Sequence, residues 1–332
     1  MKLEIVIFIV VFSLAGKAEN TFYKKTNQIT VSNDSLSLEK EINKEDETIL
    51  TESEQNFNER LKTLDSNSPM DLAYNDKVKP FIKNYLTKNK KLIARMKGLS
   101  PYYFSIFEQI LDKHDLPLEL KYLPIVESAL NPKAKSASGA TGLWQFMYLT
   151  GEQYGLNVTS YIDERQDPIK STEAACSYFI KLYEMFGDWN LVLAAYNGGP
   201  GYIQRKTTSV GENSFWELQE HLRRETRNYI PTFIAVNYAM NYAEEHKIET
   251  IFPEIVCEKS DTIILKKQID LKGMKELTCL NTATINYLNP SYKKDIYPKG
   301  SVIILPSENV KDFLLNEESN YAFIEMIENK EV

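Results

Sequence analysis

The 332-residue sequence has few of the residues that build metal sites and disulfide scaffolds. It contains three cysteines and three histidines, with no CxxC pair and no Cys/His cluster at ligand spacing. Neither a structural zinc site nor a disulfide-rich scaffold is therefore expected. Cys257 and Cys279 pair if the compartment is oxidising, and the alternative is that they are free thiols.

An excess of positive charge is also lacking. Lysine and arginine number 39 against 46 acidic residues, which gives a net charge of −7. Electrostatics therefore give no reason to expect a polyanionic partner, and no nucleic-acid binding is predicted. The 43% hydrophobic and 26% charged residues are typical of a folded globular chain rather than a fibrous or disordered one.

No apolar run is long enough to cross a membrane, which takes about 20 residues. The most marked run, Ile5 to Gly16, follows Lys2 and covers about 12 residues. Residues 1–18 therefore resemble a secretory signal peptide with cleavage after Ala18, and an uncleaved anchor is the alternative. Export to the periplasm or cell envelope is expected.

The rest of the chain divides by composition. Residues 19–69 are acidic, low in complexity and poor in aromatics, which predicts a tether. In residues 70–250 apolar side chains recur three to four apart, which predicts amphipathic helices, one of them with an N-cap at Ser171. Residues 258–308 show a β-α-α-β pattern between DTIILKKQI and SVIILP, and residues 309–332 are expected to be a C-terminal tail.

Three segments carry unusual residues. In ESALNPKAKSASGATGLWQFM, Glu127 ends an apolar helix, where loss of solvation raises a carboxyl pKa from about 4.3 toward about 6, as a general acid requires. AAYNGGPGYI ends a helix at a run of glycines, and ETRNYIP places Glu225 at a helix start. Taken singly, each has a structural interpretation as a cap or a helix stop.

In this order, over about Leu116 to Thr250, the three segments resemble the motifs of the lysozyme-like lytic transglycosylases, and most closely those of the membrane-bound lytic murein transglycosylase D group. GLWQFM, DERQDP and ETRNYIPTFIAVNYAMNY carry that closer likeness. The resemblance implies a mainly α, lysozyme-like catalytic domain followed by a small α+β module. For Asp163, Arg165 and Asp167 we expect a structural role, as a salt-bridged turn that caps the next helix.

The resemblance implies cleavage of the β-1,4 bond between N-acetylmuramic acid and N-acetylglucosamine in peptidoglycan. Glu127 matches the family's single acid/base, which protonates the glycosidic oxygen and then accepts a proton from the muramoyl 6-hydroxyl, leaving a 1,6-anhydro end. No metal or cofactor is implied. Ser136, Gln145 and Met147 match positions that line the family's sugar subsites, and Tyr196 matches the tyrosine that orients the catalytic carboxylate and the muramoyl unit. Asn197 is a neighbouring candidate for substrate binding, and Glu225 matches the family's second acidic residue, which grips a substrate amide.

The C-terminal unit resembles a degenerate LysM module, a glycan-binding β-α-α-β fold, although the usual Gly-Asp-Thr opening is missing. An appendage without sugar affinity is the alternative.

Peptidoglycan glycan strands are the expected partner, for a monomer associated peripherally with the cell envelope. Two other functions stay open: a goose-type lysozyme that uses water instead of the 6-hydroxyl, and a non-catalytic cell-wall-binding protein.

Overall fold

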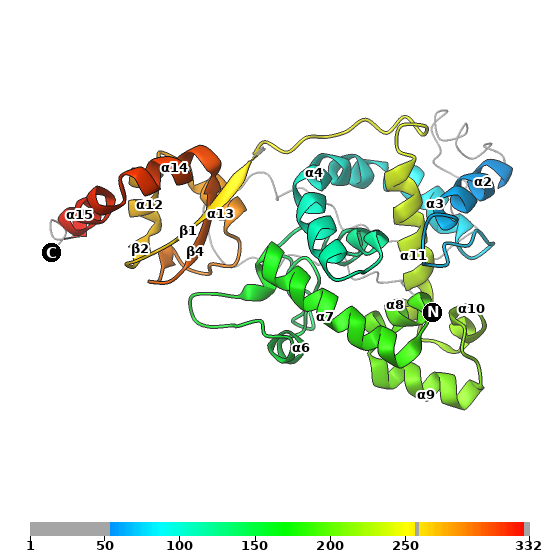
Figure 1. Ribbon diagram of the computed structural model, residues 1–332. Coiled ribbons are helices and arrows are strands. Elements are labelled where there is room, and N and C mark those ends of the chain that lie inside the picture. Colours follow the sequence, from blue (N-terminus) through cyan, green and yellow to red (C-terminus); the bar gives the residue numbers. More distant parts are fainter. Residues whose placement is uncertain (1–53, 256–258, 329–332) are drawn as a thin grey trace.

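The computed structural model describes residues 54–255 and 259–328 (Figure 1). The expected signal peptide (residues 1–18), most of the expected tether and the proposed Cys257 partner of Cys279 lie outside these ranges. In the described residues, no helix is both long and apolar enough to cross a membrane.

The first and larger part is almost entirely helical, as the periodicity predicts. Its α-helices and 3₁₀ helices are α2 (Glu54–Asp65), α3 (Lys79–Leu86), α4 (Lys90–Lys113), η1 (Leu118–Tyr122), α5 (Leu123–Ser128), α6 (Tyr148–Gln153), η2 (Glu164–Gln166), α7 (Pro168–Phe186), α8 (Trp189–Gly198), α9 (Pro200–Val210), α10 (Phe215–Leu218), η3 (Gln219–His221) and α11 (Arg224–Asn241).

Helix α11 is the central element of this part. Residues 229–240 are all buried, which is the pattern of a helix surrounded by protein rather than of a surface helix. It packs against α3, α8, α4 and α5, so the last helix of the part contacts the helices that carry each of the earlier motifs. The helix start predicted at Glu225 is therefore confirmed to within one residue, because α11 begins at Arg224.

Helix α2 lies within the segment expected to be a tether. Phe57 and Leu61 are fully buried in the same hydrophobic core as α4 and α11. Full burial of such side chains contributes about 1.5–3 kcal/mol each. Residues 54–65 are therefore part of the folded domain.

The second part is the expected α+β module. Strands β1 (Ser260–Ile264) and β4 (Val302–Pro306) pair antiparallel, and so do the short β2 (Ile269–Asp270) and β3 (Ile296–Tyr297). Helices α12 (Leu271–Thr278) and α13 (Thr282–Leu288) lie between them in sequence, and α14 (Ser307–Leu315) and α15 (Glu317–Glu328) follow. The predicted class, mainly α with a small α+β module behind, is confirmed.

The module has its own hydrophobic core, separate from that of the helical domain. Ile263, Met274 and Leu305 belong to it, and so do Phe313 of α14 and Tyr321 of α15. The core therefore continues into the segment expected to be a C-terminal tail.

One predicted helix boundary is wrong. Helix α7 begins at Pro168, three residues before Ser171, and the Asp167 carboxylate accepts hydrogen bonds from the backbone N–H groups of Ile169 and Lys170. An aspartate N-cap followed by proline at the first helical position is a stronger start signal than a serine inside the helix. Ser171 is fully buried and donates to the Asp167 carbonyl.

Candidate active site

The short helix α5 positions Glu127 in its last turn. Leu123, Pro124 and Ile125 are buried and fix the helix on the core, and the chain leaves it through Ala129, whose left-handed φ of 51° ends the helix. Ser128 Oγ donates to the Leu143 carbonyl at 3.0 Å, which ties α5 to the segment of residues 134–147, named the substrate loop below. Glu127 therefore stands on a rigid, apolar support.

The Glu127 carboxylate accepts a hydrogen bond from the Tyr229 hydroxyl of α11. Desolvation by the surrounding protein raises the pKa of Glu127 to about 7, the Tyr229 hydrogen bond opposes that rise, and the negative charge of Glu225 adds to it. At neutral pH a large fraction of the carboxyl therefore holds its proton. A general acid needs both this pKa and this supported geometry.

Tyr196 lies next to Glu127 but hydrogen-bonds elsewhere. Its hydroxyl donates to the Trp144 carbonyl at 2.6 Å, and its ring stacks on Phe179 with centroids 4.9 Å apart. Burial and the charge of Glu127 raise the pKa of Tyr196 well above its usual range, so the phenol stays protonated. Tyr196 thus holds the backbone of the substrate loop, while Tyr229 holds the carboxylate.

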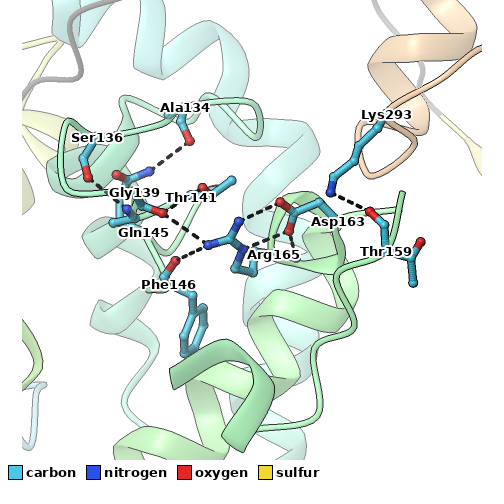
Figure 2. A network of polar contacts seen from close by, with 11 residues as sticks. Ala134, Ser136, Gly139, Thr141, Gln145, Phe146, Thr159, Asp163, Arg165 and Lys293 are labelled. Atoms are coloured by element: carbon cyan, nitrogen blue, oxygen red, sulfur yellow. Dashed lines mark hydrogen bonds and ion pairs between the residues drawn. The ribbon is translucent and has the colours of Figure 1, made fainter. Parts of the chain in front are cut away.

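The substrate loop carries three of the expected sugar-binding residues. Ser136 Oγ accepts from the Ala140 N–H at 3.0 Å, and Gln145 Nε2 donates to the Gly142 carbonyl at 2.8 Å and the Ala134 carbonyl at 3.3 Å (Figure 2). Met147 is exposed at the start of α6. Two of the three side chains therefore shape the loop itself, and Met147 is accessible to a ligand.

The second and third motif segments meet where α8 ends. A Cβ added at Gly198 would lie 2.9 Å from Thr226 Oγ1, so a residue without a side chain lets α8 approach α11 closely. Asn197, just before that contact, has a buried Oδ1 without a hydrogen-bond partner in the described residues. Glu225 is exposed in the first turn of α11.

The structure thus brings the three motif segments together around Glu127, and their roles in substrate binding stay predictions. Tyr229 was missed by the sequence reasoning. It follows Glu225 by four residues on one helix, and that spacing puts both side chains on the same face. The signal was therefore present in ETRNYIP.

The structural interpretation of Asp163, Arg165 and Asp167 is confirmed. Asp163 accepts from Arg165 through both carboxylate oxygens, at 2.9 and 2.8 Å, and Asp167 caps α7 (Figure 2). Both members of the Asp163–Arg165 ion pair are buried. In the part of the chain that the structure describes, no group of three His, Cys, Asp or Glu side chains is placed to hold a metal ion.

Two parts of this chain match known protein families. Residues 104–219 match the family "Transglycosylase SLT domain", and residues 259–322 match "Lytic transglycosylase MltD, LysM-like domain". The first match contains α5 and the substrate loop, and the second contains the module with the first half of α15.

Individual relatives cover parts of the chain. The membrane-bound lytic murein transglycosylase D of Escherichia coli K12 is 36% identical over 184 residues, which are 54% of this chain and 40% of the relative. The soluble lytic murein transglycosylase of the same strain is 32% identical over 123 residues, 35% of this chain and 19% of the relative. The chain therefore matches about two fifths of the length of the first relative.

Among solved structures, the 70 kDa soluble lytic transglycosylase of Escherichia coli is 25% identical, with a TM-score of 0.36 over 44% of this chain and 25% of that one. By sequence, residues 104–219 are thus similar to the SLT transglycosylase domain family, and residues 259–322 to the LysM-like domain family of lytic transglycosylase MltD.

Proposed function

We propose that this protein is a peptidoglycan lytic transglycosylase that cleaves the β-1,4 bond between N-acetylmuramic acid and N-acetylglucosamine. The observation that carries the proposal is the state of Glu127: a carboxyl with a pKa of about 7, held by a tyrosine hydroxyl rather than a cation, inside an SLT domain. The 36% identity to a lytic murein transglycosylase supports it.

In the proposed reaction, protonated Glu127 gives its proton to the glycosidic oxygen as the C–O bond breaks. Positive charge develops on the muramoyl anomeric carbon, and the substrate's N-acetyl group stabilises it. The Glu127 carboxylate then takes the proton of the muramoyl 6-hydroxyl, whose oxygen closes on that carbon. Atoms balance without added water, and Glu127 returns to its protonated state.

The surrounding residues supply the groove. Ser136, Gln145 and Met147 line sugar subsites along the substrate loop, and Tyr196 orients the loop and the muramoyl unit next to Glu127. Asn197, whose buried Oδ1 has no hydrogen-bond partner in the described residues, is a neighbouring candidate for substrate binding. Glu225, exposed at the start of α11, grips a substrate amide. Because its proposed substrate is peptidoglycan, we expect the enzyme in the periplasm or cell envelope.

Product mass tests the proposal. The chain without residues 1–18 is incubated with isolated sacculi beside Glu127→Gln, and soluble products are analysed by mass spectrometry. The expected result is anhydromuramoyl ends, one water lighter than hydrolysis products, that disappear in the variant. Reducing muramic ends would indicate a lysozyme of the goose type, and sacculus binding without products from either protein would indicate a non-catalytic wall-binding protein.

A further inference from the structure

The module is docked directly on the motif region of the helical domain. The Asp163 N–H donates to the Ser291 carbonyl at 2.8 Å, the Lys293 N–H donates to the Tyr161 carbonyl at 2.7 Å, and Ile162 pairs with Tyr292 as an antiparallel bridge. The loop between α6 and α7 therefore extends from the helical domain to the module and pairs with it through an isolated antiparallel bridge (Figure 1).

Side chains strengthen this docking. Lys293 Nζ donates to the Thr159 carbonyl at 2.7 Å, and the Lys294 ammonium lies 4.8 Å from the centre of the Tyr161 ring. On the other side of the interface, Tyr287 of α13 packs against Tyr102 of α4, with ring centroids 5.4 Å apart. Backbone pairing, charge and aromatic contacts together fix the position of the module on the domain.

Arg165 connects this docked loop to the substrate loop. Its guanidinium holds Asp163 with two hydrogen bonds on one side, and on the other its Nη1 donates to the carbonyls of Gly139 at 3.2 Å and Phe146 at 3.3 Å (Figure 2). Only 6% of Arg165 is exposed. The planar guanidinium has enough donors to reach both Asp163 carboxylate oxygens and the carbonyls of Gly139 and Phe146, whereas the single ammonium of a lysine does not.

The two loops are also packed without a gap. A Cβ added at Gly142 would lie 1.7 Å from the Arg165 carbonyl oxygen, and Gly142 has a φ of 91°. The turn of the substrate loop therefore rests directly on the backbone that carries Arg165. A displacement of Asp163 and Arg165 would reach Gly139, Gly142 and Phe146 and with them the expected sugar subsites.

We propose that the LysM-like module acts as a brace for the substrate loop, and that Arg165 is the positioning residue that transmits the docking at Asp163 to the loop. The inference rests on the proposed function, because the geometry it protects is that of the sugar subsites. It adds a second role for the module, which is independent of any affinity of the module for sugar.

Hydrogen exchange of the full-length protein tests the brace without reference to activity. Lys293→Ala removes the docking contact with the Thr159 carbonyl, and Lys311→Ala, which removes a lysine–glutamate contact within α14, is the matched control. Loss of one hydrogen bond predicts roughly 2- to 10-fold faster exchange of the Thr141, Gly142 and Phe146 amides in Lys293→Ala alone. Tyr287→Ala, which removes the ring contact, is an independent second variant with the same expectation.

Kinetics test whether the geometry matters. Arg165→Ala is expected to lower kcat/KM on a short soluble glycan of two disaccharide units by up to about 10²-fold, since small displacements of a site carry costs of that order. Arg165→Lys is expected to retain a kcat/KM between those of Arg165→Ala and the wild type. The pH at which the activity of either variant falls should equal that of the wild type, because Glu127 keeps its surroundings.

The outcomes separate the alternatives. If Lys293→Ala and Tyr287→Ala weaken sacculus binding but leave loop exchange and short-glycan turnover unchanged, the module is a sugar-binding appendage and the brace is overturned. Faster loop exchange in Arg165→Lys with unchanged kcat/KM would also overturn it. A wild type that yields no products from sacculi contradicts the proposed function, while the exchange result still reports on the docking.

Discussion

Two carboxylates in this protein, one buried and one half-buried, have opposite surroundings. Asp163, 3% exposed, accepts two hydrogen bonds from one side of the Arg165 guanidinium, whereas Glu127 is desolvated by the surrounding protein and faces a tyrosine hydroxyl and the negative charge of Glu225. The first is a fixed charge that holds two loops together, and the second has a pKa of about 7 and can exchange a proton. The partner of a buried acid, more than its depth, therefore decides whether it serves structure or chemistry.

The largest expected effect is on the chemistry. Glu127→Gln keeps the shape of the side chain but cannot deliver a proton, so turnover of sacculi should fall by about 10² to 10⁴. Release of anhydromuramoyl products over time measures the loss. Asp163→Asn is the comparison, and its effect on activity should be smaller at temperatures where it is folded. Near-wild-type turnover by Glu127→Gln would remove the acid role.

For the free energy of unfolding, the substitution with the large expected effect is Asp163→Asn. Asp163→Asn leaves the Arg165 charge buried without its counterion, and such a change costs about 3–5 kcal/mol of unfolding free energy. Urea denaturation followed by circular dichroism measures it. A loss below about 1 kcal/mol would mean that the ion pair is dispensable and that the two carboxylates differ less than their surroundings indicate.

The pH dependence of stability sharpens the contrast. The folded-state pKa of Glu127, about 7, lies above its ordinary value of 4.5, so the folded state binds the proton more tightly than the unfolded state. This contribution is fully present below pH 4.5 and is lost as the pH rises through 7. Unfolding midpoints of the wild type should therefore fall relative to Glu127→Gln across that window, and parallel curves would contradict the raised pKa.

Tyr229 tests one cause of the Glu127 pKa. Its hydrogen bond favours the carboxylate, so Tyr229→Phe should raise that pKa further and move the alkaline fall of kcat/KM to higher pH. A pH–rate profile on short glycans measures the shift. An unchanged profile would mean that the hydroxyl does not act on the ionised form.

Glu225 gives the smallest expected effect, with the opposite sign. Its charge raises the Glu127 pKa, so Glu225→Gln should move the alkaline fall of kcat/KM to lower pH. High salt should reduce this shift, because Glu225 is exposed. A shift in the same direction as that of Tyr229→Phe would contradict the electrostatic explanation.

The sequence predicted much of this arrangement. Helical periodicity, the β-α-α-β pattern and Glu127 at the end of an apolar helix are local features, and the structure has them. Tyr229 was predictable from its spacing to Glu225. The start of α7 was misplaced because Ser171 was favoured over the Asp167–Pro168 pair, a stronger signal three residues earlier.

Other features depend on contacts between distant segments. Nothing local in DERQDP shows that the Asp163 N–H pairs with Ser291 of the module, or that the Tyr196 hydroxyl donates to the Trp144 backbone instead of to Glu127. The burial of Phe57 and Tyr321 likewise requires partners far along the chain. Such pairings form only in the assembled core. From composition alone, the segment with Phe57 was predicted to be a tether and the segment with Tyr321 a C-terminal tail.

The most direct test of the central claim is the pKa of the Glu127 carboxyl itself. Carbon NMR of protein labelled at the glutamate carboxyl carbon, with the resonance assigned by its absence in Glu127→Gln, gives the titration without substrate. The surroundings of Glu127 predict a midpoint near 7. A midpoint near 4.5 would show an ordinary ionised carboxylate and would contradict its role as the acid.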